Sequence, residues 1–192
     1  MNVHNSEGVQ YPEPKLKIMG IEAVKTSTPL PCRDKLKESF KILMNGNEKE
    51  MKEFCVNFRR EFELLPPEDI GFPRSVNNVE KYSDTTSIYK KGTPMHVKGA
   101  LLYNHLLKTK KVSHKHQTIY EGDKGKFVHL RKNPWNANVI TFIGSLPTEF
   151  DMHKLIDYEQ QFTKSFMDPL RFILEAINWK VDASDSNTIE DF

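Results

Sequence analysis

The chain has 192 residues and a formal net charge of only +2 at pH 7; its length is enough for one domain with a core of its own. This small net charge favours no particular class of partner. No segment approaches the roughly 18 apolar residues of a membrane span, and the N-terminus lacks the basic and apolar regions of a signal peptide. These absences predict a soluble, intracellular protein.

The first predicted element is a short strand near the N-terminus. Residues 1–14 are polar without periodicity and predict a loop or frayed end. Leu16 and Ile18 then indicate a buried strand at Lys15–Met19, which Gly20 interrupts. A strand this short must join a sheet, because alone it leaves its backbone donors and acceptors unpaired.

Two helices follow. Leu36, Phe40 and Leu43 have helical spacing from Arg33 onward, and Asn45-Gly46-Asn47 ends that helix. The next helix carries an apolar stripe and stops at Pro66-Pro67; the stripe is Met51, Phe54, Phe58, Phe62 and Leu65. The tight turn predicts an antiparallel hairpin whose stripe forms core rather than a ligand site.

The middle of the chain alternates loops with compact elements. Gly71–Gly92 is rich in Ser, Thr, Asn and Lys and predicts a long surface loop, a type of loop that is often functional. Val97–Leu107 predicts a buried helix, and Thr109–Lys126 a second loop. Phe127–Leu130 and Val139–Phe142 predict two short strands around a turn at Asn133-Pro134.

A long helical region is predicted from Asp151, as N-cap, to about Asn178, with Pro169 kinking or dividing it. Val181 onward is an acidic tail. Together the elements predict an α+β fold in which helices dominate. Cys32 and Cys55 lack the spacing or context of a disulfide or metal site and are predicted to be reduced thiols.

The charges are unevenly distributed. From Tyr89 to Lys132 there are 11 Lys and Arg against only Glu121 and Asp123, whereas Glu149–Phe192 has 10 acidic and 4 basic side chains. Such a positive block is typical of a protein that binds a polyanion. A solvated, lysine-rich surface is the alternative.

Signals for catalysis are nearly absent. The sequence has no G-x-S-x-G, no P-loop and no H-E-x-x-H. His114 and His116 lie in a lysine-rich loop, where phosphate contact or simple exposure is favoured over metal binding. Asp182 and Asp185 lie in the tail, which cannot provide the rigid carboxylates of a two-metal site. We therefore predict no catalytic residue and no metal site in this chain.

Signals for binding are stronger. "RSVNNVEKY" at Arg74–Tyr82 and "YKKGTPMHVKG" at Tyr89–Gly99 combine Arg, Lys, Asn, Ser, His and Tyr. These side chains commonly donate to phosphate and sugar oxygens. No recognition-helix motif is visible, so we predict contact with a nucleic-acid backbone without readout of base sequence.

Four strings, taken in order, resemble the C-terminal end of family B DNA polymerases, with the closest likeness to the replicative enzymes of T-even-type tailed phages. They are "KLKIMGIEAVKTSTP", "RSVNNVEKY", "TPMHVKGALLYN" and the closing "EDF". The likeness runs from about Tyr11 to Phe192. The more specific parts are the pattern of Gly20, Glu22 and Lys25 and the run Lys98–Asn104.

The resemblance implies a domain organisation. Residues 1–28 correspond to the end of the palm, 29–180 to the thumb with a small β insertion, and 181–192 to an acidic tail. It implies that the catalytic aspartates, and the Mg²⁺ they use, belong to a palm-bearing partner, so that this chain is inactive alone. It also implies either a subunit of a polymerase encoded in two pieces or a truncated reading frame; an initiator Met ahead of an intact strand favours the former.

The resemblance further implies which residues bind primer–template duplex DNA. They are Lys25, Ser27, Ser75, Asn78, Lys81, Tyr82, Lys91, Lys98 and Lys164. Asp168 stands where the family often has another lysine, which reduces the expected share of this helix in DNA binding. Ile189 and Phe192 in "NTIEDF" correspond to the end that docks on the sliding clamp, although a Phe-Phe ending is the family's usual form.

The expected setting is the cytoplasm of an infected bacterial host. A stand-alone, non-catalytic nucleic-acid-binding accessory protein is the alternative. An upstream reading frame that ends in Lys-x-Tyr and contains a Tyr-Gly-Asp-Thr-Asp-type motif would support the polymerase interpretation.

Overall fold

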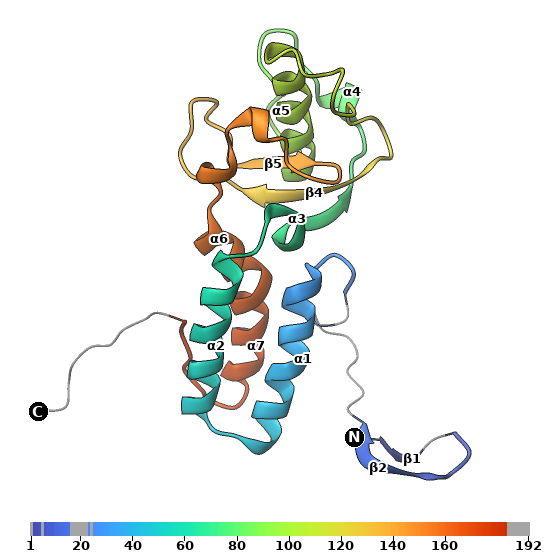
Figure 1. Ribbon diagram of the computed structural model, residues 1–192, viewed down its shortest axis with the longest axis vertical. Helices are drawn as coiled ribbons and strands as arrows, with labels where there is room; N and C mark the ends of the chain where they lie inside the picture. The colour runs from blue at the N-terminus through green and yellow to red at the C-terminus, as the bar shows by residue number, and fades with distance from the viewer. Residues whose placement is uncertain (1, 5, 16–22, 24, 184–192) are drawn as a thin grey trace, which may run out of the picture.

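The protein consists of two lobes arranged along its long axis (Figure 1). The computed structural model describes residues 2–4, 6–15, 23 and 25–183. The helical lobe consists of the helices α1 (Leu30–Asn45), α2 (Glu48–Glu63), α6 (Tyr158–Phe162) and α7 (Asp168–Glu175). The sheet lobe consists of residues 71–156 and contains a small sheet and the helix α5 (Met95–Thr109). The α+β fold dominated by helices is confirmed.

The predicted helical hairpin is confirmed. α1 spans Leu30–Asn45 and α2 spans Glu48–Glu63, and they lie side by side. The Asn47 side chain caps α2 by accepting a hydrogen bond from the backbone N–H of Glu50 at 3.0 Å. Met51, Phe58 and Phe62 of the predicted stripe are fully buried, which confirms its role as core.

The C-terminal helical region is less continuous than predicted. Asp157, not Asp151, caps the first α-helix, α6 (Tyr158–Phe162), and accepts from the backbone N–H of Gln160 at 2.9 Å. Asp151 instead has a positive φ of 54°, after the 3-10 turn Thr148–Phe150 and before the 3-10 turn His153–Leu155. The prediction of a helix starting at Asp151 is therefore wrong.

The predicted break near Pro169 is present as a change of helix type. A π-helical segment, Thr163–Met167, joins α6 to α7 (Asp168–Glu175), and Pro169 lies in the first turn of α7. Proline has no N–H and its ring clashes with the carbonyl four residues earlier, so the wider turn accommodates it without ending the helix. The π segment places Phe166 against Phe58 of α2, with ring centroids 4.8 Å apart.

The sheet lobe contains a three-stranded antiparallel sheet of order β3-β4-β5. β4 (Lys124–His129) and β5 (Val139–Phe142) confirm the two predicted strands. β3 (Phe72–Ser75) corrects the prediction of an unstructured loop over Gly71–Gly92, as does the single turn of α4 (Val79–Tyr82). β3 is an edge strand, where Pro73 is tolerated because one side of its backbone needs no partner.

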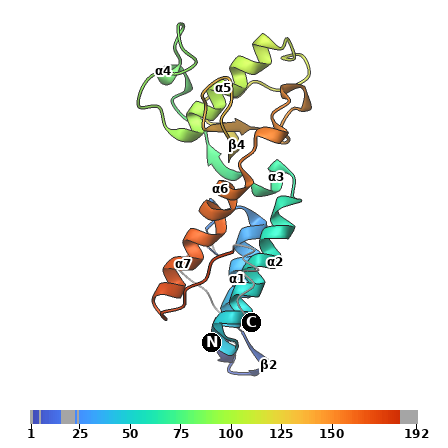
Figure 2. The ribbon, with the colours of Figure 1, turned by 90° about the vertical axis from the view of Figure 1, so that its left-hand side faces the viewer.

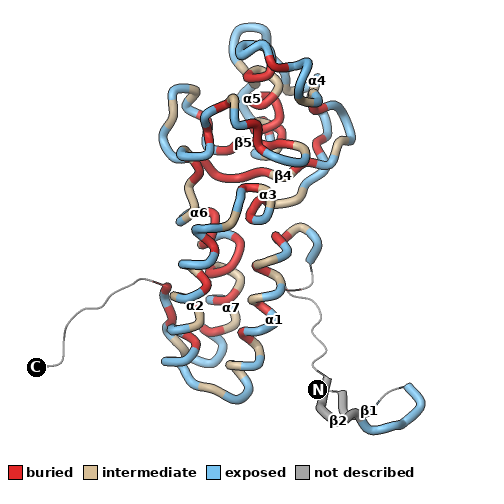
Figure 3. The backbone as a smooth tube through the Cα atoms, viewed as in Figure 1, coloured by how far each residue is buried: buried red, intermediate tan, exposed pale blue. Residues whose placement is uncertain are grey.

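Helix α5 (Met95–Thr109) confirms the predicted buried helix and packs on β5. Figure 3 shows that α5, β4 and β5 contain much of the buried backbone of this lobe. Gly99 makes the close approach possible, because a Cβ there would lie 2.6 Å from the backbone nitrogen of Thr141. The glycine of the Lys98–Asn104 run therefore has a packing role.

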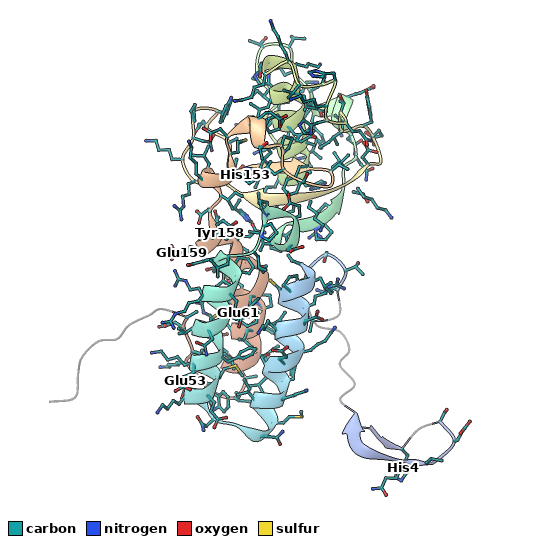
Figure 4. All side chains as sticks on the ribbon, viewed as in Figure 1. His4, Glu53, Glu61, His153, Tyr158 and Glu159 are labelled. Carbon is teal, nitrogen blue, oxygen red and sulfur yellow. The ribbon has the colours of Figure 1, made fainter. Side chains whose placement is uncertain are left out.

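The two lobes meet at a short helix, α3 (Pro67–Ile70), and a buried polar network. The Gln161 amide oxygen accepts from the backbone N–H of His129 at 3.0 Å and lies 2.7 Å from His129 Nδ1, while its nitrogen donates to the Ile70 carbonyl at 2.6 Å. The hydroxyl of Tyr158, labelled at the junction in Figure 4, donates to the carbonyl of Leu65 at 2.8 Å. Gln161 thus joins α6 to β4 and to α3, and Tyr158 joins α6 to the segment after α2.

The structure tests the predictions for the two ends of the chain only in part. Residues 2–4 (β1, Asn2–His4) and Gln10–Lys15 (β2) form an antiparallel hairpin, so the loop predicted over residues 1–14 is wrong. The predicted strand at Lys15–Met19 lies almost entirely outside the described residues. At the other end, Val181 and Ala183 are buried, and Arg59 of α2 donates to the Ala183 carbonyl at 3.2 Å.

Cys32 of α1 and Cys55 of α2 are both free, as predicted, and both are buried. Among the described residues, no helix has both the length and the apolar character needed to cross a bilayer.

Candidate nucleic-acid interface

Cationic side chains from three parts of the chain converge on a groove of about 510 Å³ beside the lobe junction. Lys25 comes from the segment before α1, Arg74 from β3 and Lys164 from the π segment. Phe172 of α7, a lining residue, is 80 % exposed and adds an apolar surface. We call this feature the junction groove.

Asp168 opposes these cations within the junction groove. Its carboxylate lies 2.9 Å from Lys164 Nζ and 3.5 Å from a guanidinium nitrogen of Arg171. The carboxylate therefore neutralises part of the positive charge that Lys164 would offer to a phosphate.

Arg74 links the groove to the sheet lobe. Its guanidinium donates to the carbonyls of Pro73, at 3.0 Å, and Ser27, at 3.4 Å. Burial, and then the nearby Arg74 charge, lower the pKa of His96 in the first turn of α5. Arg74 thus lies between the segment that holds Lys25 and Ser27 and the start of the helix that holds Lys98.

A second group of cations lies in the first turn of α5 and on the loop between β3 and α5, which we call the lysine loop (residues 76–93). Lys81 Nζ lies 5.3 Å from the ring centroid of Tyr82, and Lys98 Nζ lies 5.5 Å from that of Tyr89. Lys90 donates from its backbone to the Tyr82 carbonyl at 3.0 Å and from its Nζ to the Lys81 carbonyl at 2.9 Å. These contacts fold the loop back on itself, so that Lys81, Lys90 and Lys98 belong to one surface.

The elements of this surface are not suited to sequence-specific recognition of DNA bases. α4 has only four residues, and eight of the fifteen residues of α5 are buried against the rest of the lobe. A helix that reads the major groove must present one face to base edges. The arrangement suits contacts with phosphates and sugars.

The structure brings the predicted residues into two sets rather than one. Lys25 and Lys164 line the junction groove, with Ser27 joined to it through Arg74. The other set belongs to β3, the lysine loop and α5: Ser75, Asn78, Lys81, Tyr82, Lys91 and Lys98. In Figure 2, α7 and the α4 loop lie on the same side of the long axis. The predicted clamp-binding residues Ile189 and Phe192 lie outside the described residues.

Three further residues share these surfaces although the sequence did not single them out. Arg74 and Lys90 stand within the quoted binding strings, so their position beside predicted contacts was the available signal. Phe172 gave no signal, because helical spacing alone does not show that it faces outward.

His114 and His116, the two histidines considered for phosphate contact, differ in exposure and in their contacts. His114 is exposed, whereas His116 Nε2 lies 3.0 Å from a carboxylate oxygen of Glu149. Hydrogen bonds from its own backbone amide and from His116 lower the pKa of Glu149 to about 2. His116 therefore tethers the loop after α5 to the 3-10 turn at Glu149. Within the described part of the chain, no group of three or more His, Cys, Asp or Glu side chains is arranged to hold a metal ion.

The chain is similar to bacteriophage DNA-directed DNA polymerases. It is 31% identical to the enzyme of Enterobacteria phage T4 over 181 residues, and 33% identical to that of Escherichia phage RB69 over 175 residues. These alignments cover 92% and 88% of this chain. The resemblance predicted from the sequence motifs is confirmed.

The chain spans about a fifth of the length of these curated relatives, 20% of the T4 polymerase and 19% of the RB69 polymerase. No protein-family model matches it.

Proposed function

We propose that this chain is the thumb portion of a phage DNA polymerase and holds primer–template duplex DNA by its backbone. The observation that carries the proposal is the similarity, over about nine-tenths of the chain, to two phage DNA-directed DNA polymerases. The clustering of cationic side chains in the junction groove and on the lysine loop supports it.

Binding in this proposal is electrostatic and independent of sequence. Lysine and arginine side chains neutralise phosphates and release counterions, which makes affinity fall steeply with salt. Tyr82 and Tyr89 hold the neighbouring ammonium groups of Lys81 and Lys98 through cation–π contacts. The lysines are thereby partly ordered before DNA arrives.

The proposal also assigns the parts of the chain. Residues 1–28 form the end of the palm, 29–180 the thumb and 181–192 a tail that binds the sliding clamp through Ile189 and Phe192. The catalytic carboxylates and their Mg²⁺ belong to a palm-bearing partner, and the complete enzyme acts in the cytoplasm of an infected bacterium. The chain alone is expected to extend no primer, because catalysis by two metal ions requires carboxylates on a rigid scaffold.

The principal test is a fluorescence titration with duplex DNA of two unrelated sequences at several salt concentrations. If about four to six phosphates are neutralised, the slope of log K against log salt is about −4 to −5 for both sequences. The triple variant Lys81→Ala/Lys91→Ala/Lys98→Ala should flatten this slope by up to about one unit for each of the three lysines that binds a phosphate.

A matched control removes three exposed lysines from the helical hairpin, in Lys41→Ala/Lys49→Ala/Lys52→Ala. Both triple variants change the net charge equally. A slope independent of salt, or equal effects of the two triple variants, would contradict a DNA-binding surface on the lysine loop.

The clamp proposal has its own test. Calorimetric titration of the sliding clamp should detect weak binding by the full chain and loss of binding by Ile189→Ala/Phe192→Ala. Two apolar side chains three residues apart share one side of a helical turn and can enter a hydrophobic groove. Equal binding by both proteins, or none by either, would refute this anchor.

A further inference from the structure

The only two acidic residues of the positive block, Glu121 and Asp123, both accept hydrogen bonds from backbone amides. The Glu121 carboxylate accepts from the N–H of Asn78 at 2.8 Å and from that of Val79 at 3.1 Å, one with each oxygen. The Asp123 carboxylate accepts from the N–H of Tyr120 at 2.8 Å. Glu121 therefore bridges two segments that are more than 40 residues apart in the sequence.

The two amides held by Glu121 lie where the lysine loop changes direction. Asn78 has a left-handed conformation, with φ of 62° and ψ of 35°, and Val79 begins the single turn of α4 that carries Lys81 and Tyr82. A positive φ is uncommon for a residue other than glycine, although asparagine adopts it more readily than most. The carboxylate satisfies both amides at this point, and charge-assisted bonds of this kind are stronger than neutral ones.

Backbone pairing fixes the start of the same loop. Val76 donates to the Asp123 carbonyl and Gly122 donates to the Val76 carbonyl, each at 2.8 Å. These bonds extend the pairing of β3 with β4 beyond the strands themselves. Glu121 then holds the next part of the loop, which the strand pairing does not reach.

Asn104 fixes the segment that carries Glu121. Its side chain donates to the Ile119 carbonyl at 2.8 Å and accepts from the Ile119 N–H at 2.9 Å. Asn104 is the last residue of the Lys98–Asn104 run and stands on the buried helix α5. The position of Glu121 is therefore set by the core of the sheet lobe through Asn104 and Ile119.

We propose that Glu121 is a positioning residue for DNA binding, which holds Asn78 and Val79 so that Lys81 and Tyr82 are presented to the duplex. This inference rests on the proposed function. A carboxylate on a surface that binds phosphates repels DNA, so its presence lowers affinity unless it orders the side chains that bind. Its two hydrogen bonds to the loop provide that ordering.

The test compares Glu121→Gln with Glu80→Gln in titrations with duplex DNA. Glu80 is an exposed acid on α4 whose carboxylate makes no hydrogen bond or ion pair with the described residues. Both variants remove one negative charge: Glu80 lies on the lysine loop itself, and Glu121 lies in the segment that bonds to it. Glu80→Gln should bind DNA at least as tightly as wild type at 0.1 M salt, because the variant removes a charge that repels phosphates without breaking an ion pair. Glu121→Gln should bind about threefold to tenfold more weakly than Glu80→Gln, because only one acceptor oxygen remains for two amides.

A second readout does not depend on DNA. Hydrogen exchange at the Asn78 and Val79 amides, followed by NMR, should become about tenfold faster in Glu121→Gln and faster still in Glu121→Ala. Exchange in the core of α2 should be unchanged, which shows that the fold is intact.

The outcomes separate the two proposals. Wild-type protein that fails to bind DNA would overturn the proposed function, and with it this role of Glu121. Wild-type binding together with equal or tighter binding by Glu121→Gln than by Glu80→Gln would overturn this inference alone. Unchanged exchange at Asn78 and Val79 would also overturn it.

Discussion

Asp168 should weaken DNA binding by neutralising Lys164, so replacing it by lysine should strengthen binding. The carboxylate contacts Lys164 and Arg171 and lines the junction groove together with Lys25 and Arg74. The variant Asp168→Lys frees Lys164, the one of these two cations that lines the groove, and adds another cation. The side chains of Lys164 and Asp168 are 54% and 40% exposed, so losing their ion pair should cost about 1 kcal/mol of stability or less.

The size of the effect follows from counterion release. Each phosphate that the protein neutralises adds about 0.9 to the slope of log K against log salt, so one further phosphate strengthens binding about eightfold at 0.1 M salt relative to 1 M. Asp168→Asn frees Lys164 without adding a cation and should neutralise at most one further phosphate. Asp168→Lys should neutralise up to two, which corresponds to about sixtyfold.

The assay is the salt-dependent titration with duplex DNA, with Glu159→Lys as the control. Glu159 is an exposed acid on α6, labelled in Figure 4, and does not line the junction groove. Its replacement changes the net charge by the same amount as Asp168→Lys. Equal slopes for Asp168→Lys and wild type, or equal increases in affinity for Asp168→Lys and Glu159→Lys, would refute a role of the junction groove in binding phosphate.

The remaining predictions concern the fold. Gly99→Ala should lower the free energy of unfolding by about 2 kcal/mol in urea titrations, because its Cβ would lie 2.6 Å from the backbone nitrogen of Thr141; unchanged stability would show that α5 can move away from β5. Burial raises the pKa of Cys32 and of Cys55 to about 12, so both thiols should react with a disulfide reagent at pH 8 only after unfolding, and rapid reaction of the native protein would contradict their burial. Burial lowers the pKa of His129 below its ordinary value of about 6.5. As the pH drops below about 6.5, His129 therefore takes up a proton more readily in the unfolded chain than in the native protein, and the free energy of unfolding should fall. His129→Gln should show a shallower fall in urea titrations across this range, whereas an identical pH dependence would contradict the prediction.

The pattern of apolar residues was sufficient to predict the elements that form the core. α2 has an apolar stripe at helical spacing, whereas α5, β4 and β5 contain continuous apolar runs that are buried on more than one side. Edge strand β3 has no such signal. Phe72 and Pro73 are partly buried and Arg74 and Ser75 are exposed, so no alternation marks the strand.

The prediction that the last helical region starts at Asp151 was wrong for a different reason. Asp151 and Asp157 are both suitable N-caps by residue type, and only the tertiary structure selects between them. Asp157 donates its backbone N–H to the carbonyl of His129 at 2.9 Å, which ties the true start of α6 to β4. Asp151 is instead left in a turn with positive φ.

The candidate site was predictable as a set of residue types and not as a surface. Resemblance and charge selected lysines from four segments, but which lysines share a surface depends on the tertiary fold. The roles of Asn104 and Glu121 were also beyond the sequence, since their partners lie 15 and more than 40 residues away. Those partners are backbone groups, whose positions no residue type reveals.

The division of the cations between two lobes makes the junction part of the proposed binding mechanism. Each lobe carries only some of the positive side chains, and two weak sites reinforce one another only when their geometry permits both to engage one ligand. Gln161 holds β4 and α3 together through His129 and Ile70, inside a buried network where an unsatisfied partner would be costly. The junction thereby keeps the junction groove and the lysine loop in a fixed relation. The slope of log K for DNA binding against log salt therefore depends on an intact junction as well as on the number of lysines. If the junction were disrupted, the lobes would bind DNA independently, each would release only its own share of counterions, and the slope would be less steep.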